Sequence, residues 1–153
     1  MKELLIRRAL REDVAAIVRL LADDHLGSAR EKITDPLPES YLLAFEEINR
    51  DPRQELIVAQ SEESVIGCMQ LTIIPGLSNQ GARRAQIEAV RVDAHLRNKG
   101  IGEQLIKYAI ERARYHGCKV VQLTTHQSRT NAHRFYERLG FHHTHLGFKL
   151  SVD

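Results

Sequence analysis

The sequence lacks any apolar run that approaches membrane-spanning length, so we expect no transmembrane helix. The first ten residues also lack the apolar core of a signal peptide, because they include four charged side chains. Only two cysteines are present, Cys68 and Cys118, and they do not have the spacing of metal ligands. These absences predict a cytoplasmic protein with reduced, packed thiols, no bound metal and no membrane partner.

The sequence also lacks a strong excess of charge, since its formal net charge is +2 with the histidines neutral. Without a basic stripe or a recognised nucleic-acid motif, we expect no nucleic-acid partner. Internal repeats and low-complexity segments are absent as well. The 153 residues therefore predict one domain over residues 1–153 with a substantial hydrophobic core.

The order of helical and strand-like patterns indicates the fold class. Apolar residues recur at helical spacing in the segments 12–22, 40–50, 102–114 and 130–139. Strand-like runs cover 4–9, 55–60, 65–74, 85–92 and 119–125, and one or two further strands are expected within Phe141–Leu150. Helices alternate with strands only in the second half, while the middle is a meander. This order predicts an α/β or α+β protein with a mixed sheet flanked by helices.

The sharpest motif lies between a predicted strand and the best-defined predicted helix: Arg97-Asn98-Lys99-Gly100-Ile101-Gly102. Its glycines allow a tight turn that exposes consecutive backbone N–H groups, and the dipole of the following helix adds partial positive charge. A pyrophosphate fits such a turn, with Arg97 and Lys99 as nearby cations.

Two other phosphate-binding motifs do not fit this segment. A P-loop requires Gly-Lys-Ser or Gly-Lys-Thr after its glycines, and neither occurs here. The dinucleotide-binding fingerprint requires a third glycine where Leu105 stands. The pattern that remains, Arg-x-x-Gly-x-Gly, resembles the acetyl-CoA signature of the GNAT N-acetyltransferases.

Three further segments extend the resemblance over nearly the whole chain. Residues 87–93 resemble the family's fourth strand, and Ala132–Phe141 matches the closing pattern Ala-x-x-Phe-Tyr-x-x-x-Gly-Phe. The opening residues 6–13 are similar to the family's first strand and helix. Within the family, Ala132–Tyr136 and the His-rich ending are similar to the aminoalkylphosphonate N-acetyltransferases.

The resemblance implies a GNAT-type, mostly antiparallel sheet whose fourth and fifth strands splay apart to admit the pantetheine arm of acetyl-CoA. It implies that the main chain at Val90, Arg91 and Val92 pairs with this arm. The N–H of Val92 would point at the thioester carbonyl, where it would also stabilise negative charge on that oxygen.

The resemblance implies further contacts with acetyl-CoA outside this strand. Residues 97–102 would hold the pyrophosphate, and Arg138 and Asn131 would contribute from the last helix. Arg129 stands where many members carry asparagine, and Asn131 is the nearest replacement. The family contains many homodimers, so the resemblance also admits a homodimer.

Two side chains match the family's catalytic positions. Glu88 matches the base that deprotonates the amine, directly or through a water. Strand alternation places it on one face with Val90 and Val92. Tyr136 matches the acid that protonates the departing thiolate. Each has a structural alternative, because Glu88 could be an exposed or ion-paired carboxylate and Tyr136 could be a core aromatic residue.

Together these residues predict an acetyl-CoA-dependent N-acetyltransferase that acts on the amine of a small molecule by direct attack in a ternary complex. Acetylation of a protein lysine or N-terminus, and acyl-CoA binding without catalysis, stay open as alternatives. Arg83 and Arg84 lie near the expected acceptor entrance and could bind a carboxylate or phosphonate, or could simply be solvated. Asp23, Asp24 and His25 lie in a loop that borders the acceptor pocket in this family.

Overall fold

The computed structural model describes residues 3–153, which form two compact units with a boundary after Gln122. The first unit holds all but one of the helices and the β-sheet except for its last residue, Leu123. The second unit begins at Leu123 and holds the remaining helix. The single domain expected from the chain length stays a prediction.

The sheet has five strands in the order β1-β2-β3-β4-β5. Strands β1 to β4 pair antiparallel with their neighbours, whereas β4 and β5 are parallel. The mixed, mostly antiparallel sheet predicted from the sequence is therefore confirmed. The strands are β1 (Leu4–Arg8), β2 (Gln54–Ser61), β3 (Ser64–Ile74), β4 (Arg83–Val92) and β5 (Cys118–Leu123).

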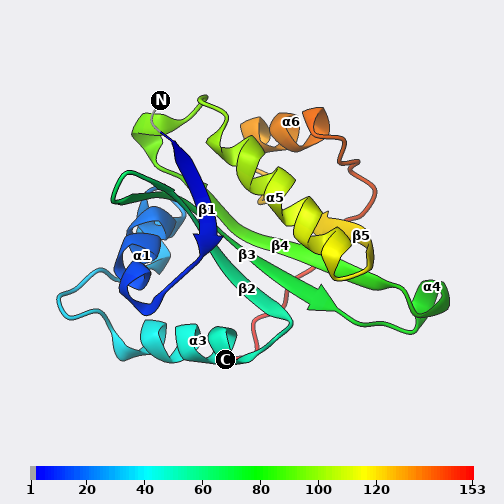
Figure 1. Cartoon of the computed structure of the whole chain (residues 1–153), viewed down its shortest axis with the longest axis horizontal. Coiled ribbons are helices and arrows are strands. Elements are labelled where there is room, and N and C mark those ends of the chain that lie inside the picture. Colours follow the sequence, from blue (N-terminus) through cyan, green and yellow to red (C-terminus); the bar gives the residue numbers. More distant parts are fainter. Residues whose placement is uncertain (1–2) are drawn as a thin grey trace. The chain divides into compact units, whose positions relative to one another are not determined.

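The three longest helices of the first unit begin and end close to the predicted positions, 12–22, 40–50 and 102–114. Gly117, with a φ of 72°, follows the longest of them, and its N–H donates to the carbonyl of Arg114 at 2.9 Å. Short 3₁₀ turns, Arg11–Asp13 and Ala94–Leu96, precede two of the helices. The helices are α1 (Val14–Ala22), α2 (Gly27–Arg30), α3 (Glu39–Arg50), α4 (Ser78–Gly81) at the tip of the β3–β4 hairpin, and α5 (Ile101–Tyr115) (Figure 1).

Helices cover both faces of the sheet. On one face, Val18 of α1 and Phe45 of α3 share a hydrophobic cluster with Cys68 of β3. On the other face, a Cβ added at Gly67 would lie 3.1 Å from Cδ1 of Leu105, so glycine lets α5 approach the sheet closely. We call the side of Cys68 the α1 face and the side of Gly67 the α5 face.

β4 contains one residue more than the facing stretch of β3. Gln70 pairs with Glu88, and Cys68 pairs with Arg91. Between these pairs β3 contributes one residue and β4 contributes two, which is a β-bulge. Ala89, in the bulge, has a φ of 54°, in the left-handed region. The bulge shifts the side-chain alternation of β4 by one residue.

The prediction that Glu88, Val90 and Val92 share one face is therefore wrong. Directly paired residues of two antiparallel strands project to the same face. Glu88 lies with Gln70 on the α1 face, whereas Val92 pairs with Gly67 on the α5 face. Simple alternation assumes that every residue has one partner across the ladder, and the extra residue of the bulge breaks that assumption.

The second unit contains α6 (Thr130–Arg138), which ends close to its predicted position. Residues 139–153 form no helix and no strand, so the strands predicted within Phe141–Leu150 are wrong. Leu146, Phe148 and Leu150 alternate as in a strand, but they are 80%, 93% and 87% exposed. A strand also needs a hydrogen-bonded partner, and residues 139–153 form no strand pairing in this structure.

Candidate active site

The predicted phosphate-binding turn lies directly before α5. Gly100 immediately precedes the helix with a φ of 80°, and Asn98 also has a positive φ, of 63°. The first N–H groups of a helix have no intrahelical carbonyl partner, and the helix dipole places partial positive charge there. The turn therefore has the backbone conformation in which successive N–H groups can bind an anion.

Two cations stand beside this turn. Arg97 and Lys99 are exposed, and neither makes a hydrogen bond or ion pair with any residue in the range 3–153. The preceding 3₁₀ turn is fixed by Asp93, whose carboxylate accepts the N–H of His95 at 2.8 Å. Both cations are thus available to a ligand, while the backbone beneath them is held in place.

The segment expected to pair with pantetheine follows the bulge in β4. The carbonyl of Val90 accepts a hydrogen bond from Nη1 of Arg91 at 2.8 Å. The guanidinium of Arg91 also faces Asp24, with 3.7 Å between Nε and Oδ2, and both side chains are largely buried. Arg91 can therefore offer its main chain to a cofactor while its side chain lies on the α1 face.

Asp24 connects this strand to the loop after α1. Its Oδ1 accepts the backbone N–H of Gly27 at 2.6 Å. A Cβ at Gly27 would lie 1.9 Å from the carbonyl oxygen of Leu21, so only glycine fits there. Of the three residues singled out in this loop, Asp24 is partly buried whereas Asp23 and His25 are exposed.

Glu88 lies in β4 directly before the bulge. Its side chain is exposed, and it makes no hydrogen bond or ion pair with the rest of the described chain, residues 3–153. The structural alternative in which Glu88 is ion-paired therefore does not occur in this structure. A carboxylate without a partner is available to bind an ammonium group or to accept its proton.

The two cysteines are poor nucleophiles. Cys68 is 1% exposed, and its Sγ lies 3.6 Å from the carbonyl oxygen of Ala89 in the bulge. Burial raises the pKa of Cys68 to about 12 and also raises the pKa of Cys118. Both thiols are therefore protonated at neutral pH, which does not favour an acyl-cysteine mechanism.

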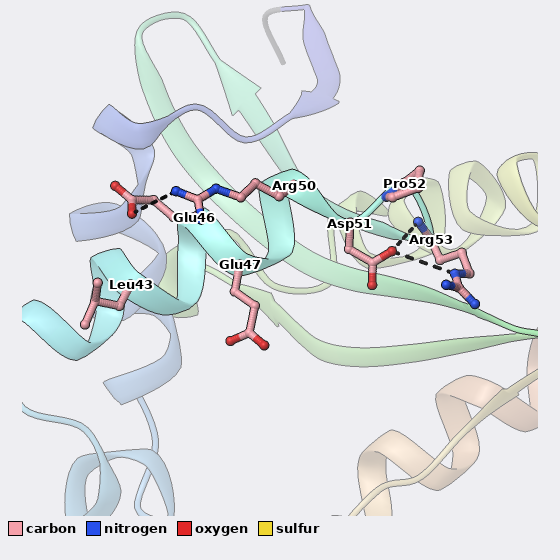
Figure 2. Close-up of a pocket in the computed structure, with 7 residues that line it drawn as sticks. All are labelled: Leu43, Glu46, Glu47, Arg50, Asp51, Pro52 and Arg53. Atoms are coloured by element: carbon pink, nitrogen blue, oxygen red, sulfur yellow. Dashed lines mark hydrogen bonds and ion pairs between the residues drawn. The ribbon is translucent and has the colours of Figure 1, made fainter.

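A surface hollow lies along α3 and the turn into β2 (Figure 2). Its charges interact with each other: Arg50 faces Glu46 at 3.9 Å, and Asp51 accepts the N–H of Arg53 at 2.8 Å. None of the predicted site residues lines it. The hollow is therefore not the candidate active site. Its lining consists of Leu43, Glu46, Glu47, Arg50, Asp51, Pro52 and Arg53.

Within residues 3–153, no group of three or more His, Cys, Asp or Glu side chains is arranged to hold a metal ion. In the same part of the chain, no helix combines the length and the apolar character needed to cross a membrane.

The comparison with known families decides the assignment. The sequence profile described as the Acetyltransferase (GNAT) family matches residues 14–141. The chain belongs to this family. The resemblance drawn from residues 97–102 and from the closing pattern is thereby confirmed at the level of the family.

Solved structures similar to this GNAT chain extend over nearly its whole length. One, described as a transcriptional regulator from Bacillus halodurans C-125, is 48% identical, with a TM-score of 0.95 over 97% of this chain and 99% of that chain. Another, described as a putative acetyltransferase from Agrobacterium tumefaciens strain C58, is 25% identical, with a TM-score of 0.85 over 96% of this chain and 99% of that chain.

Curated relatives of this GNAT chain match over shorter segments. The aminoalkylphosphonate N-acetyltransferase of Salmonella typhimurium strain LT2 is 38% identical over 63 residues, which are 41% of this chain and 41% of that protein. The chain spans less than half the length of the curated relatives that it matches.

The remaining residues that the sequence predicts for the site of this GNAT chain belong to the second unit. The ring of Tyr136 makes edge contacts with Phe135 and Phe141, with centroids 5.1 and 5.8 Å apart. Asn131 and Arg138 are exposed on α6. The catalytic role of Tyr136 and the cofactor contacts of Asn131 and Arg138 stay predictions.

Sequence reasoning missed two side-chain pairs that involve β4 of this GNAT fold. One is the pair of Arg91 with Asp24. The other joins β4 to β5, where Nε2 of Gln122 donates to Oε1 of Gln86 at 2.7 Å. Neither pair has a sequence signal, because the partners are far apart in the chain and their types are common on any surface.

Proposed function

We propose that this GNAT chain transfers the acetyl group of acetyl-CoA to the amine of a small molecule, by direct attack in a ternary complex. The main observation that supports this proposal is the turn before α5. GNAT acetyltransferases use acetyl-CoA, and the left-handed Gly100 with exposed, partnerless Arg97 and Lys99 suits its pyrophosphate.

The bulged segment of β4 suits the rest of the cosubstrate. A bulge changes the direction of the main-chain groups that follow it in its strand, here those of Val90 and Val92. In the proposed complex, the main chain of Val90 and Val92 pairs with the amides of the pantetheine arm. An N–H group directed at the thioester carbonyl stabilises the negative charge that develops on its oxygen during the reaction.

Glu88 supplies the base in this proposal. An alkylammonium ion has no lone pair, and simple amines are mostly protonated at pH 7. The Glu88 carboxylate, exposed and without an ion-pair partner in residues 3–153, takes the proton directly or through a water. The amine nitrogen then bonds to the thioester carbon as the carbon–sulfur bond breaks.

The sulfur leaves as a thiolate and needs a proton. We assign this proton to the hydroxyl of Tyr136, on the strength of its match to the closing GNAT pattern. A positioned acid or base each contributes about 10²–10⁴-fold to the rate. The products are the acetylated amine and free CoA, so each turnover releases one thiol.

A thiol-release assay with acetyl-CoA tests the proposal. The acceptor panel should contain polyamines, amino acids, aminophosphonates, aminoglycosides and short peptides. Release above the acceptor-free rate, together with mass-spectrometric detection of the acetylated amine, supports the proposal. A peptide acetylated far faster than every small amine would favour the alternative of a protein acceptor.

Calorimetric titration with acetyl-CoA distinguishes the remaining alternative. Tight binding without turnover on any acceptor would indicate an acyl-CoA-binding protein without catalysis. One solved structure similar to this chain is described as a transcriptional regulator, which makes this control worthwhile. Absence of both binding and turnover would overturn the whole proposal.

A further inference from the structure

Two adjacent arginines at the start of β4 point to opposite faces of the sheet. Arg83 donates from Nη1 to the carbonyl of His116 at the end of α5, at 3.0 Å. Arg84 pairs in register with Ile74, and Glu88 pairs with Gln70. Residues 70 and 74 are four positions apart on one strand, so Arg84 and Glu88 share the α1 face.

Arg84 and Glu88 are the ends of a polar row along β4. Between them stands Gln86, and the residues on either side of it, Ala85 and Ile87, are buried on the α5 face. Gln122 of β5 donates to Gln86 at 2.7 Å. We call Arg84, Gln86, Glu88 and Gln122 the β4 row.

The two charges of the β4 row have no partners. Neither Arg84 nor Glu88 makes a hydrogen bond or ion pair within the described residues 3–153. A strand rises about 3.3 Å per residue, so their Cα atoms are about 13 Å apart and the two side chains do not neutralise each other. The β3 residues paired with this row, Ile74, Thr72 and Gln70, carry no charge that competes for a ligand.

The amide pair between the charges can also bind a ligand. A primary amide has two donor hydrogens and an acceptor oxygen. The bond from Gln122 to Gln86 uses one donor and one acceptor position. The amide nitrogen of Gln86 and the oxygen of Gln122 still have positions for groups in the middle of a bound molecule.

We propose that the β4 row selects the acceptor, and that the acceptor is an amine with a distant anionic group, long enough to reach from Glu88 to Arg84, whose Cα atoms are about 13 Å apart, with hydrogen-bonding groups between. The ammonium binds Glu88 and the anion binds Arg84, as guanidinium groups bind carboxylates and phosphates. This inference rests on the proposed function, because it places the amine at the proposed base. It predicts that compounds with only a few bonds between the amine and the anionic group are not the preferred acceptors.

Glycine oligomers test the length and the charge together. An extended chain spans about 3.3–3.6 Å per residue, so tetraglycine matches the spacing of the row. Each oligomer of one to five residues is compared as its free acid and as its C-terminal amide, in the thiol-release assay and by calorimetric titration of the protein saturated with CoA. The neutral amides share the amine but lack the anion.

We expect the wild-type protein to prefer the acid over the amide for three to five residues, with no such preference for glycine itself. Arg84→Gln should lower the acid-to-amide ratio of kcat/KM by about tenfold, the usual worth of one charge-assisted contact. Arg83→Gln is the matched control, since Arg83 lies on the other face and should leave the ratio unchanged.

Several outcomes would overturn the inference. The first is equal use of acids and amides by the wild-type protein, and the second is an unchanged acid-to-amide ratio of kcat/KM in Arg84→Gln. The others are an equal loss of this ratio in Arg83→Gln and preferred use of a short aminoalkylphosphonate. Failure of every oligomer to react or bind, while neutral amines are acetylated, also overturns it. If no amine reacts at all, the proposed function fails. The role of Arg84 is then still tested by comparing the affinities of the wild-type protein and Arg84→Gln for tetraglycine.

Discussion

Nε of Arg91 lies 3.7 Å from Oδ2 of Asp24, and this pair joins the loop after α1 to the bulged segment of β4. Both side chains are largely buried, at 18% and 15% exposure. Asp24 also accepts the N–H of Gly27, and Arg91 also donates to the carbonyl of Val90. The pair therefore fixes the loop and the strand backbone at the same time.

Asp24→Asn should lower the free energy of unfolding by about 1–3 kcal/mol, because it removes the negative charge that faces a largely buried guanidinium. Denaturant titration measures this loss. Asp23→Asn is the matched control, since Asp23 is exposed and should change stability by less than about 0.5 kcal/mol. Equal stability of the two variants would show that the pair contributes nothing.

Gly100→Ala should weaken CoA binding about tenfold or more, because its φ of 80° disfavours an L-residue and a changed turn loses charge-assisted N–H contacts. Gly117→Ala is the matched control. Its φ is 72°, and at both glycines an added Cβ would meet no described atom within 4 Å, so each variant should lose about 1 kcal/mol of stability. If calorimetry gave equal CoA affinities for Gly100→Ala and Gly117→Ala, the turn before α5 would not be the phosphate-binding site.

Tyr136→Phe should lower kcat by about 10²–10⁴-fold while acetyl-CoA affinity barely changes, because only the hydroxyl is lost. Phenylalanine keeps the edge contacts with Phe135 and Phe141, so the variant should still fold. Tyr115→Phe, at an exposed tyrosine on α5, controls for the loss of a phenol elsewhere. Unchanged single-turnover rates would return Tyr136 to the role of a packed aromatic residue.

Glu88→Gln should lower kcat/KM about 10²–10⁴-fold near pH 7, because glutamine cannot take the proton of the ammonium. The loss should shrink as the pH rises towards the pKa of the amine, about 10, since the neutral nucleophile then forms without a base. Glu63→Gln, in the β2–β3 turn, is the control. A loss that stays constant with pH would contradict the base assignment, and so would a variant with full activity at pH 7.

The decrease in the free energy of unfolding at alkaline pH should depend on Cys68. Burial raises the pKa of its thiol from 9.0 to about 12, so above pH 9 the unfolded chain releases a proton that the folded chain keeps. The stability that this thiol contributes is complete below pH 9 and falls by about 1.4 kcal/mol per pH unit until pH 12. Cys68→Ala should be less stable at pH 7 but show a flatter decline between pH 9 and 11 in denaturant titrations. An identical slope would contradict the assignment.

The sequence predicts the regular elements of the first unit well because their periodicities are long and clear. Helix α5 combines a 3.6-residue apolar period with a glycine at each end, and both signals are local. The turn at residues 97–102 is predicted for the same reason. Its glycines and cations are adjacent in the chain, so no tertiary contact is needed to recognise them.

The features that escaped prediction depend on partners across the sheet. Ala89 carries no signal for a bulge, since alanine rarely adopts a positive φ and does so here because β3 and β4 differ by one residue in register. The different directions of Arg83 and Arg84 follow from strand pairing, which the dipeptide itself does not reveal. Leu146, Phe148 and Leu150 alternate as in a strand, but alternation alone does not supply a hydrogen-bonded partner.

In β4, the face of the sheet to which a side chain projects depends on whether its residue lies before or after the bulge. Before Ala89 the even-numbered residues project to the α1 face, and after the bulge the odd-numbered Arg91 does so. The same residues in a regular strand without the bulge would carry the guanidinium of Arg91 into the apolar layer beneath α5, at a cost of several kcal/mol. The extra residue at Ala89 and Val90 is therefore compatible with Glu88 and Arg91 lying in the same layer, and deleting one of these two residues would remove the bulge without moving either side chain to the other face.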